Sequence, residues 1–197
     1  MSAPVPYTPL NDPSAPRLVT PDDPDAPARV ARLRQIGVGN LPVPEFDQFA
    51  RDLARSVGAP YAMVNFIDEN QQYFAGLFTP ADGQPSVDLA PQQASTGRVM
   101  AKDHGWCPHV VVRKKALVLE DVCDYPRFAG NPVINQIGIR SYIGAPLIDW
   151  NTGIALGTVC AIAPDITPWG RQGLETIKSM AQRMVDRLHQ IEDQGGL

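Results

Sequence analysis

The stretch from Leu117 to Leu147 limits the possible folds more than any other part of the chain. It opens with three apolar residues typical of a short strand and is then interrupted by residues that favour turns. Its last part alternates, with Ile139 and Ile143 on one face and Arg140 and Tyr142 on the other. Two strands therefore enclose a loop that is rich in aromatic and charged side chains.

The composition of this loop has two interpretations. Tyr125 and Phe128 supply the ring surface of a small-molecule pocket, in which Arg127 and Asn131 fix the orientation of a ligand. The same rings could instead fill a satellite core under the loop, with the arginines bonded to backbone carbonyls. The pattern alone leaves both interpretations open.

Three strings of residues in and after this stretch carry a family resemblance: D-x-x-x-Y-P-R-F-A-G-N-P-V, G-I-R-S-Y-I-G-A-P-L and G-x-x-L-G-T-V-C-A-I. With them the chain resembles the GAF domain family, in the branch common in bacterial sensor kinases and cyclic-dinucleotide enzymes. The resemblance extends from about Arg29 to about Ile191. It implies an α+β fold with a ligand pocket on the sheet face opposite the terminal helices. It names no ligand or cofactor, because GAF domains bind many different molecules.

Charge and cysteine content argue against several classes of protein. The chain has 197 residues, a net charge of -4 and a pI near 5.3, whereas a nucleic-acid-binding protein needs a basic face. No apolar run approaches the roughly 18 residues of a membrane span, and the N-terminus lacks a signal-peptide pattern. The three cysteines form neither a disulfide framework nor a paired zinc motif. We therefore expect a cytoplasmic protein with reduced thiols, no metal and no membrane or nucleic-acid partner.

The chain divides into an arm, one domain and a tail. Seven prolines fall within residues 1–25, and few apolar groups accompany them, so this segment is expected to be a flexible arm or a docking peptide. Residues 26–192 form the expected single domain, and residues 193–197 a tail.

Periodicity and turn residues give the expected order of elements. In chain order they are a helix at 26–36, a helix at 44–56, a hairpin of strands at 61–68 and 71–78, a lid-like loop at 79–93, a short helix at 94–102, a short helix through 108–113, a strand at 117–119, a hairpin of strands at 141–148 and 154–162, and a long helix at 168–192. In the first helix Val30 and Leu33 form the apolar face, and Arg29, Arg32 and Arg34 point away from it. Hairpin connections favour a mainly antiparallel sheet of five or six strands, and hence an α+β fold with the terminal helices on one face.

The long C-terminal helix carries an apolar seam with heptad spacing. Its members are Leu174, Ile177, Ala181, Met184, Leu188 and Ile191. The seam spans about two and a half repeats, which is short for a coiled coil. It suits either a homodimer through the terminal helices, as GAF domains often form, or packing on the chain's own sheet.

Cys107 is the most reactive-looking group, because it opens a short helix whose dipole favours a thiolate. His109 lies two residues away on the same helix and is therefore a poor immediate base for it. Cys160 is expected to pack in the core, and Cys123 to be more exposed. GAF-type enzymes that reduce free methionine sulfoxide use cysteines in a context that Cys107 and Cys123 do not reproduce.

The leading hypothesis is a non-catalytic sensory GAF module that binds a small molecule and signals through its terminal helices to a twin or to a partner protein. The expected ligand-binding residues are Phe74, Trp106, Phe128 and Tyr142 as apolar walls, Arg127, Asn131, Arg140 and His109 as polar contacts, and Cys107 in the lining. One alternative is a thiol-based redox enzyme or sensor using Cys107. Another is an interaction adaptor whose pocket is vestigial.

Overall fold

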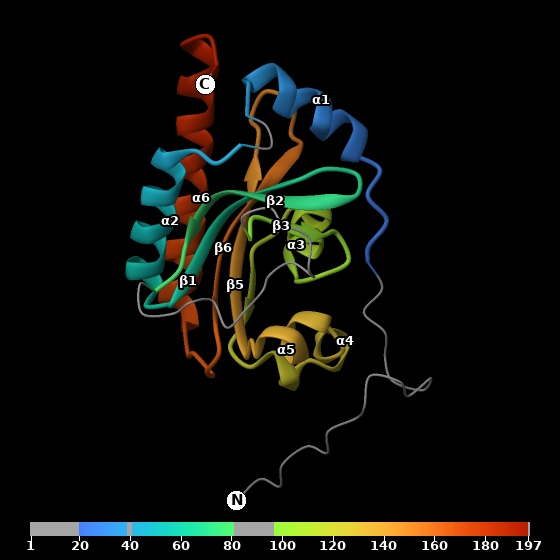
Figure 1. Cartoon of the computed structure of the whole chain (residues 1–197), viewed down its shortest axis with the longest axis vertical. Helices are drawn as coiled ribbons and strands as arrows, with labels where there is room; N and C mark the ends of the chain where they lie inside the picture. Colours follow the sequence, from blue (N-terminus) through green and yellow to red (C-terminus); the bar gives the residue numbers. More distant parts are fainter. Residues whose placement is uncertain (1–19, 39–40, 81–96, 197) are drawn as a thin grey trace, which may run out of the picture.

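The computed structural model describes residues 20–38, 41–80 and 97–196. Within these residues one six-stranded sheet separates two layers of helices (Figure 1). The strands are β1 (Tyr61–Ile67), β2 (Gln71–Phe78), β3 (Val99–Ala101), β4 (Leu117–Leu119), β5 (Ser141–Ile148) and β6 (Ala155–Ala163). Their order is β3-β2-β1-β6-β5-β4, and every neighbouring pair is antiparallel. The expected α+β fold with an antiparallel sheet is confirmed.

Two hairpins build the centre of the sheet, as the turn residues predicted. Between β1 and β2 the carboxylate of Asp68 accepts the backbone N–H groups of Asn70 and Gln71, both at 2.7 Å. Between β5 and β6 the N–H of Gly153, in the left-handed region at φ 70°, donates to the carbonyl of Asp149. The two hairpins then join edge to edge through β1 and β6.

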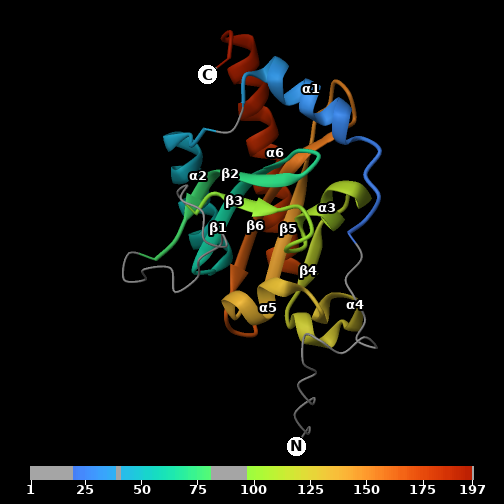
Figure 2. The same cartoon turned by 45° about the vertical axis from the view of Figure 1, so that its right-hand side comes forward.

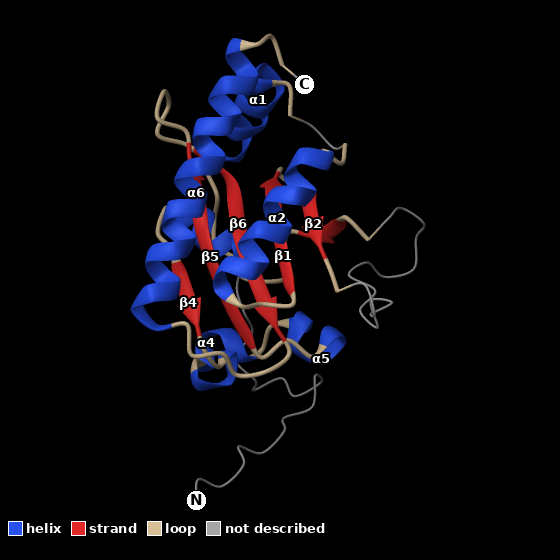
Figure 3. Cartoon of the chain, turned by 90° about the vertical axis from the view of Figure 1, so that its left-hand side faces the viewer, coloured by secondary structure: helices blue, strands red, loops and turns tan. Residues whose placement is uncertain are grey.

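One face of the sheet is covered by α2 (Pro44–Val57) and α6 (Gly170–Asp193), which lie in front of the strands in Figure 3, while α1 (Ala26–Ile36) lies at the top, by the ends of the strands and against α6. In α2 the buried residues Phe46, Ala50 and Leu53 recur with the helical period and face the sheet. A Cβ on Gly76 of β2 would collide with the backbone of Phe46, so glycine at this position lets α2 approach the strand closely.

The opposite face carries α3 (Cys107–Arg113), the 3-10 turn η1 (Val122–Asp124), α4 (Pro126–Ala129) and α5 (Pro132–Ile137), which lie on the other side of the sheet in Figures 1 and 2. Sequence analysis treated the η1 to α5 region as a loop. Pro126 and Pro132 each stand in the first turn of a short helix, and Gly138 ends α5 at φ 68°. These helices are too short to show a 3.6-residue period, so only their start and stop residues indicate them in the sequence.

The helix expected at 94–102 is wrong for the part that the structure describes. Residues 99–101 form the edge strand β3, which pairs with β2 from Gln71 to Tyr73. The side chain of Gln72 secures this edge, because its Nε2 donates to the carbonyls of Ala101 and His104. Of the lid-like loop expected at 79–93, residues 81–93 lie outside the described part of the chain.

The expected orientation of α1 is also wrong, because two of its three arginines face inward. Arg29 is 1% exposed and Arg32 is 7% exposed. Arg29 donates to the carbonyl of Ala155 and forms two hydrogen bonds with the carboxylate of Asp23. Hydropathy assigned the arginines to the solvent side, but carboxylates and a carbonyl provided by distant segments satisfy them in the interior.

The apolar seam of α6 is used within the chain itself. Ile177, Met184 and Leu188 are completely buried in the core that α6 shares with the sheet and α2. Pairing of two copies through the terminal helices remains a prediction, and it would have to use other residues of these helices. Among the described helices, none combines the length and the apolar character needed to cross a membrane.

Candidate functional site

A cavity of about 30 Å³ lies between the sheet and the layer formed by α3 and α5. Its lining is mostly apolar and comes from Met63, Gln72, Phe74, Met100, Gly105, Trp106, Cys107, Val133, Ile137, Ile139, Tyr142 and Ile162. Pockets that hold drug-sized ligands measure about 300 to 1,000 Å³. This cavity therefore has room for roughly one or two non-hydrogen atoms, because the surrounding rings already occupy most of the space.

Trp106 and Tyr142 form the aromatic wall of the cavity. Their ring centroids are 5.3 Å apart at an interplanar angle of 50°, and both side chains are about 1% exposed. Tyr142 lies across Gly144 on the same face of β5, where a Cβ would collide with its hydroxyl group. Because Gly144 has no side chain, the Tyr142 hydroxyl can occupy the space above it.

Asn131 positions Trp106 from outside the cavity. Its Oδ1 accepts the N–H groups of Gly105 and Val133, and its Nδ2 donates to the Gly105 carbonyl at 2.7 Å. One buried side chain thus caps α5 and holds the turn that leads into α3. The local sequence Asn-Pro at 131–132 is a typical helix start, which explains why this asparagine occupies the cap position.

The structure brings four of the nine expected site residues to the cavity: Phe74, Trp106, Cys107 and Tyr142. Asn131, His109 and Phe128 are buried nearby without lining it. Arg127 is exposed, with its guanidinium over the Phe128 ring, and Arg140 pairs with the carboxylate of Asp121. Neither arginine lines the cavity, and the role of all nine residues in ligand binding remains a prediction.

His109 is held neutral inside the short-helix layer. Its ring packs edge-on against Phe128 with centroids 5.3 Å apart, and its Nδ1 is buried with no hydrogen-bond partner among the described residues. Burial, with smaller contributions from the charges of Arg127 and Arg113, lowers the pKa of His109 from 6.5 to about 4. The imidazole is therefore unprotonated at neutral pH.

A pair of thiols lies at one side of the cavity, where Cys107 lines it and Cys160 lies next to Cys107 without lining it. The Sγ atoms of Cys107 and Cys160 are 3.5 Å apart, and the Tyr142 hydroxyl lies 3.4 Å from Cys107 Sγ. The interaction with Cys160 lowers the pKa of the Cys107 thiol, against the opposing effect of burial, and it raises the pKa of Cys160. The pair therefore favours a thiolate on Cys107 and a proton on Cys160.

Neighbouring polar side chains favour the same thiolate. Thr158, Tyr142 and Asn65 all lower the pKa of Cys107. Thr158 Oγ1 and Asn65 Oδ1 are buried and have no hydrogen-bond partner among the described residues. The Thr158 hydroxyl is thus a donor that no protein acceptor uses, and a thiolate beside it can accept the proton in a hydrogen bond.

The sequence predicted simple core packing for Cys160 and gave no reason to expect Asn65, Gln72 or Thr158 beside it. A usable signal was present, because Thr158 and Cys160 stand two residues apart on an otherwise apolar strand and so share a face. In the sheet Asn65 lies opposite Thr158, and Gly144 lies opposite Cys160. The residue pattern within one strand does not show which strands are its neighbours in the sheet. The cluster can therefore be recognised only in the folded structure.

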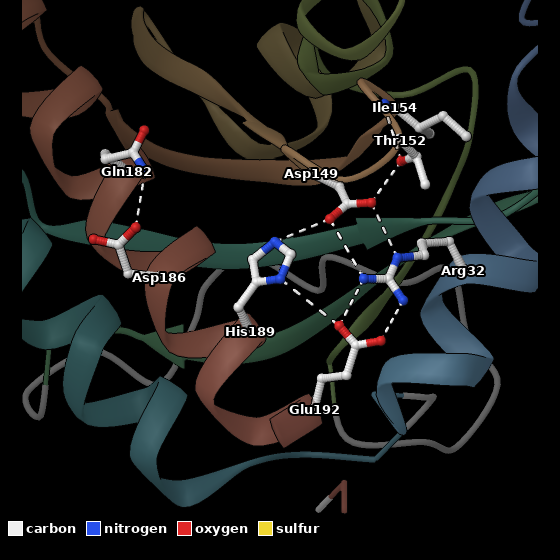
Figure 4. Close-up of polar contacts among 8 residues, drawn as sticks. All are labelled: Arg32, Asp149, Thr152, Ile154, Gln182, Asp186, His189 and Glu192. Atoms are coloured by element: carbon white, nitrogen blue, oxygen red, sulfur yellow. Dashed lines mark hydrogen bonds and ion pairs between the residues drawn. The ribbon is translucent and has the colours of Figure 1, made fainter. Parts of the chain in front are cut away.

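A second polar cluster lies on the helix side of the sheet and ties α1, the β5–β6 turn and α6 together (Figure 4). The buried carboxylate of Asp149 accepts hydrogen bonds from Arg32 and Thr152, and His189 Nε2 lies 2.9 Å from it. Glu192 pairs with the same guanidinium. Although burial raises it, the hydrogen bonds from Arg32 and Thr152 bring the pKa of Asp149 below its usual value.

Neither cluster has the geometry of a metal centre. In the described residues no group of three or more His, Cys, Asp or Glu side chains is arranged to hold a metal ion.

The antiparallel sheet, with terminal helices on one face and a short-helix layer over a cavity on the other, forms an α+β domain. The chain belongs to the GAF domain family, whose family model matches residues 43–187. Helix α1 precedes the matched region, so its two inward-facing arginines lie outside the part of the chain that the family model matches.

Solved structures with the same fold have diverse roles. A free methionine-R-sulfoxide reductase from Neisseria meningitidis, solved with its substrate, aligns at 16% identity and a TM-score of 0.57, over 90% of this chain and 98% of that chain. The GAF domain of an Acinetobacter phosphoenolpyruvate-protein phosphotransferase aligns at 12% identity and a TM-score of 0.57, over 88% and 99%. A far-red cyanobacteriochrome photoreceptor aligns at 10% identity and a TM-score of 0.56, over 84% and 94%. These identities establish the fold and no particular activity.

No protein with curated annotation matches the sequence significantly.

Proposed function

We propose that this chain is a regulatory GAF module that binds a small molecule at the cavity beside Trp106 and transmits the binding to α6 without catalysing a reaction. The observation that carries the proposal is the indole of Trp106. Its Nε1 is buried and has no acceptor among the described residues, and the residue lines the cavity. An unmet buried donor costs about 1 to 3 kcal/mol, which a ligand with an acceptor atom would recover.

The size of the cavity limits the ligand. A molecule of a few atoms fits beside the rings, whereas a larger one requires Trp106 or α5 to move outward. Val133 and Ile137 of α5 both line the cavity, so displacement of this six-residue helix is the simplest way to enlarge it. The ligand expected from the lining has an apolar body and one hydrogen-bond acceptor.

A change at the cavity has to cross only the sheet to reach α6. Tyr142 and Ile162 face the cavity, while their neighbours Ile143 and Ala161 face the core that contains α6. Movement of the cavity wall therefore alters the surface on which α6 packs. The Arg32–Asp149 cluster then couples the β5–β6 turn to the last turns of the same helix.

The near absence of free space favours one alternative, an interaction adaptor whose pocket is vestigial. In that case the filled cavity is simply part of the core, and function lies on the outer surface. The two functions differ in whether the protein carries a ligand.

Native mass spectrometry of protein isolated in a single rapid affinity step distinguishes them. We expect a non-covalent extra mass that disappears under denaturing conditions. The variant Val133→Ile adds one methyl group to the cavity wall and should reduce the ligand-bound fraction several-fold. Val118→Ile makes the same change at a partly buried position of the opposite core and should leave it unchanged.

Bare wild-type protein in this experiment would contradict ligand sensing and favour the adaptor. Equal loss of bound mass in Val133→Ile and Val118→Ile would show that the ligand responds to general destabilisation and lies elsewhere.

A further inference from the structure

We propose that Cys107 and Cys160 form a reversible disulfide within one chain when a small hydroperoxide enters the cavity. The starting geometry is a pair of buried thiols from different elements, α3 and β6, with Sγ atoms 3.5 Å apart. A disulfide needs about 2.05 Å, so the two sulfurs must approach by about 1.5 Å. The proposal rests on the proposed sensory function only for its output, and it gives the same cavity a second kind of input.

Access to Cys107 comes from the cavity itself. Cys107 lines it, and its room for roughly one or two non-hydrogen atoms suits hydrogen peroxide and excludes bulky oxidants. The Tyr142 hydroxyl and the unpartnered Thr158 hydroxyl adjoin the same thiol, where they can support a thiolate and donate to the departing oxygen. Cys160 lies behind Cys107 and does not line the cavity.

The chemistry balances in two steps. The Cys107 thiolate attacks one oxygen of hydrogen peroxide, the O–O bond breaks, and the second oxygen leaves as water after taking up a proton; Cys107 becomes a sulfenic acid. The Cys160 thiol then attacks Cys107 Sγ and expels the sulfenic oxygen as a second water. The two thiols lose two electrons and two protons in total, and the peroxide is reduced to two waters.

Closing this bond would reshape the cavity. Cys107 is the first residue of α3 and follows Trp106, so pulling its sulfur toward β6 shifts the start of the helix and the indole beside it. The contact between Cys107 Sγ and the Tyr142 hydroxyl is lost at the same time. Oxidation and ligand binding would thus act on the same wall of Trp106 and Tyr142.

Cys123 provides an internal comparison. It is only half-buried, and burial raises its pKa. Exposure alone predicts that Cys123 reacts first with peroxide, whereas the proposal predicts that the buried Cys107 does. The order of oxidation therefore separates the two outcomes.

The test treats the reduced full chain with hydrogen peroxide in moderate excess, blocks the remaining thiols under denaturing conditions, and maps the products by peptide mass spectrometry. We expect a Cys107–Cys160 linked peptide, a free Cys123, and loss of the Cys107 thiol at least tenfold faster than loss of Cys123. Dithiothreitol should restore both thiols. Cys123→Ala is the matched control and should form the same disulfide at an unchanged rate.

Cys160→Ala should stop the reaction at a sulfenic acid on Cys107, which dimedone traps when it is present as the oxidised protein is unfolded. If this variant does not fold, the wild type and Cys123→Ala still decide the question. Three results would each overturn the proposal. Cys123 could be oxidised faster than Cys107, a disulfide could include Cys123, or Cys107 and Cys160 could both stay free when Cys123 is oxidised. Native mass spectrometry of reduced protein tests ligand sensing separately, so one proposal can fail while the other stands.

Discussion

At the scale of single residues, Tyr142 depends on the glycine two positions further along its strand. Its ring lies across Gly144, its hydroxyl reaches Cys107, and its face meets Trp106. Burial raises the pKa of the Tyr142 hydroxyl well above its usual value, so the group stays protonated and available as a donor. A change at Gly144, which does not line the cavity, would therefore reach the cavity through Tyr142, which does.

We expect Gly144→Ala to destabilise the protein by about 1 to 3 kcal/mol, because the new methyl group overlaps the tyrosine hydroxyl. Urea unfolding followed by circular dichroism measures the loss. The double variant Gly144→Ala with Tyr142→Phe removes the overlapping hydroxyl and should recover part of the stability. Simple addition of the two single effects would show that the two residues do not interact.

His109 gives a pH dependence whose direction follows from its lowered pKa. The unfolded chain binds a proton near pH 6.5, whereas the folded chain does so only near pH 4, so stability falls as the pH decreases between these values. We expect a loss of about 2 kcal/mol near pH 5 relative to pH 7.5. His109→Gln should lack this part of the pH dependence in urea unfolding. Identical pH profiles for the two proteins would mean that His109 is already accessible to protons in the folded state.

At the scale of elements, α1 is held mainly by two buried arginines. Its aliphatic face is small, and Arg29 and Arg32 attach it to the ends of β5 and β6 and to α6. Such pairs are costly to break, because the partner that remains is a buried charge. Leu33 and Ile36 pack in the core as the hydropathy pattern predicted, and the two arginines add electrostatic contacts that the pattern did not predict.

The variant Arg32→Ala leaves the fully buried Asp149 carboxylate without its main partner, and we expect it to destabilise the protein by about 3 kcal/mol. Arg187→Ala is the control, because Arg187 also joins α6 to an N-terminal helix, through Glu45, but at the surface. Its effect should be much smaller. Comparable midpoints for the two variants in urea unfolding would contradict the weight given to the buried pair.

At the scale of the whole molecule, the fold was largely predictable from sequence and the site only partly. The hairpin turns, the helix start and stop residues and the string from Asp121 to Leu147 led to the right architecture. Phe74, Trp106, Cys107 and Tyr142 lie together at one cavity, and their role in ligand binding stays a prediction. The partnership of Cys107 with Cys160 was not predictable, since it depends on which strand lies behind α3. The burial of Arg29 and Arg32 was missed for the same reason, because Arg29 bonds to Ala155 and Arg32 to Asp149, each more than a hundred residues away.

The three tryptophans can serve as fluorescence reporters for three different parts of the molecule. The chain has three: Trp106 at the cavity, Trp169 buried with its Nε1 bonded to the Val57 carbonyl, and Trp150 exposed but stacked on His189. Each indole thus belongs to a different part of the molecule: the cavity wall, the helix-side core and the polar cluster. Variants that keep one tryptophan and replace the others with phenylalanine would let fluorescence follow each part separately, so that the order in which the parts respond becomes directly visible.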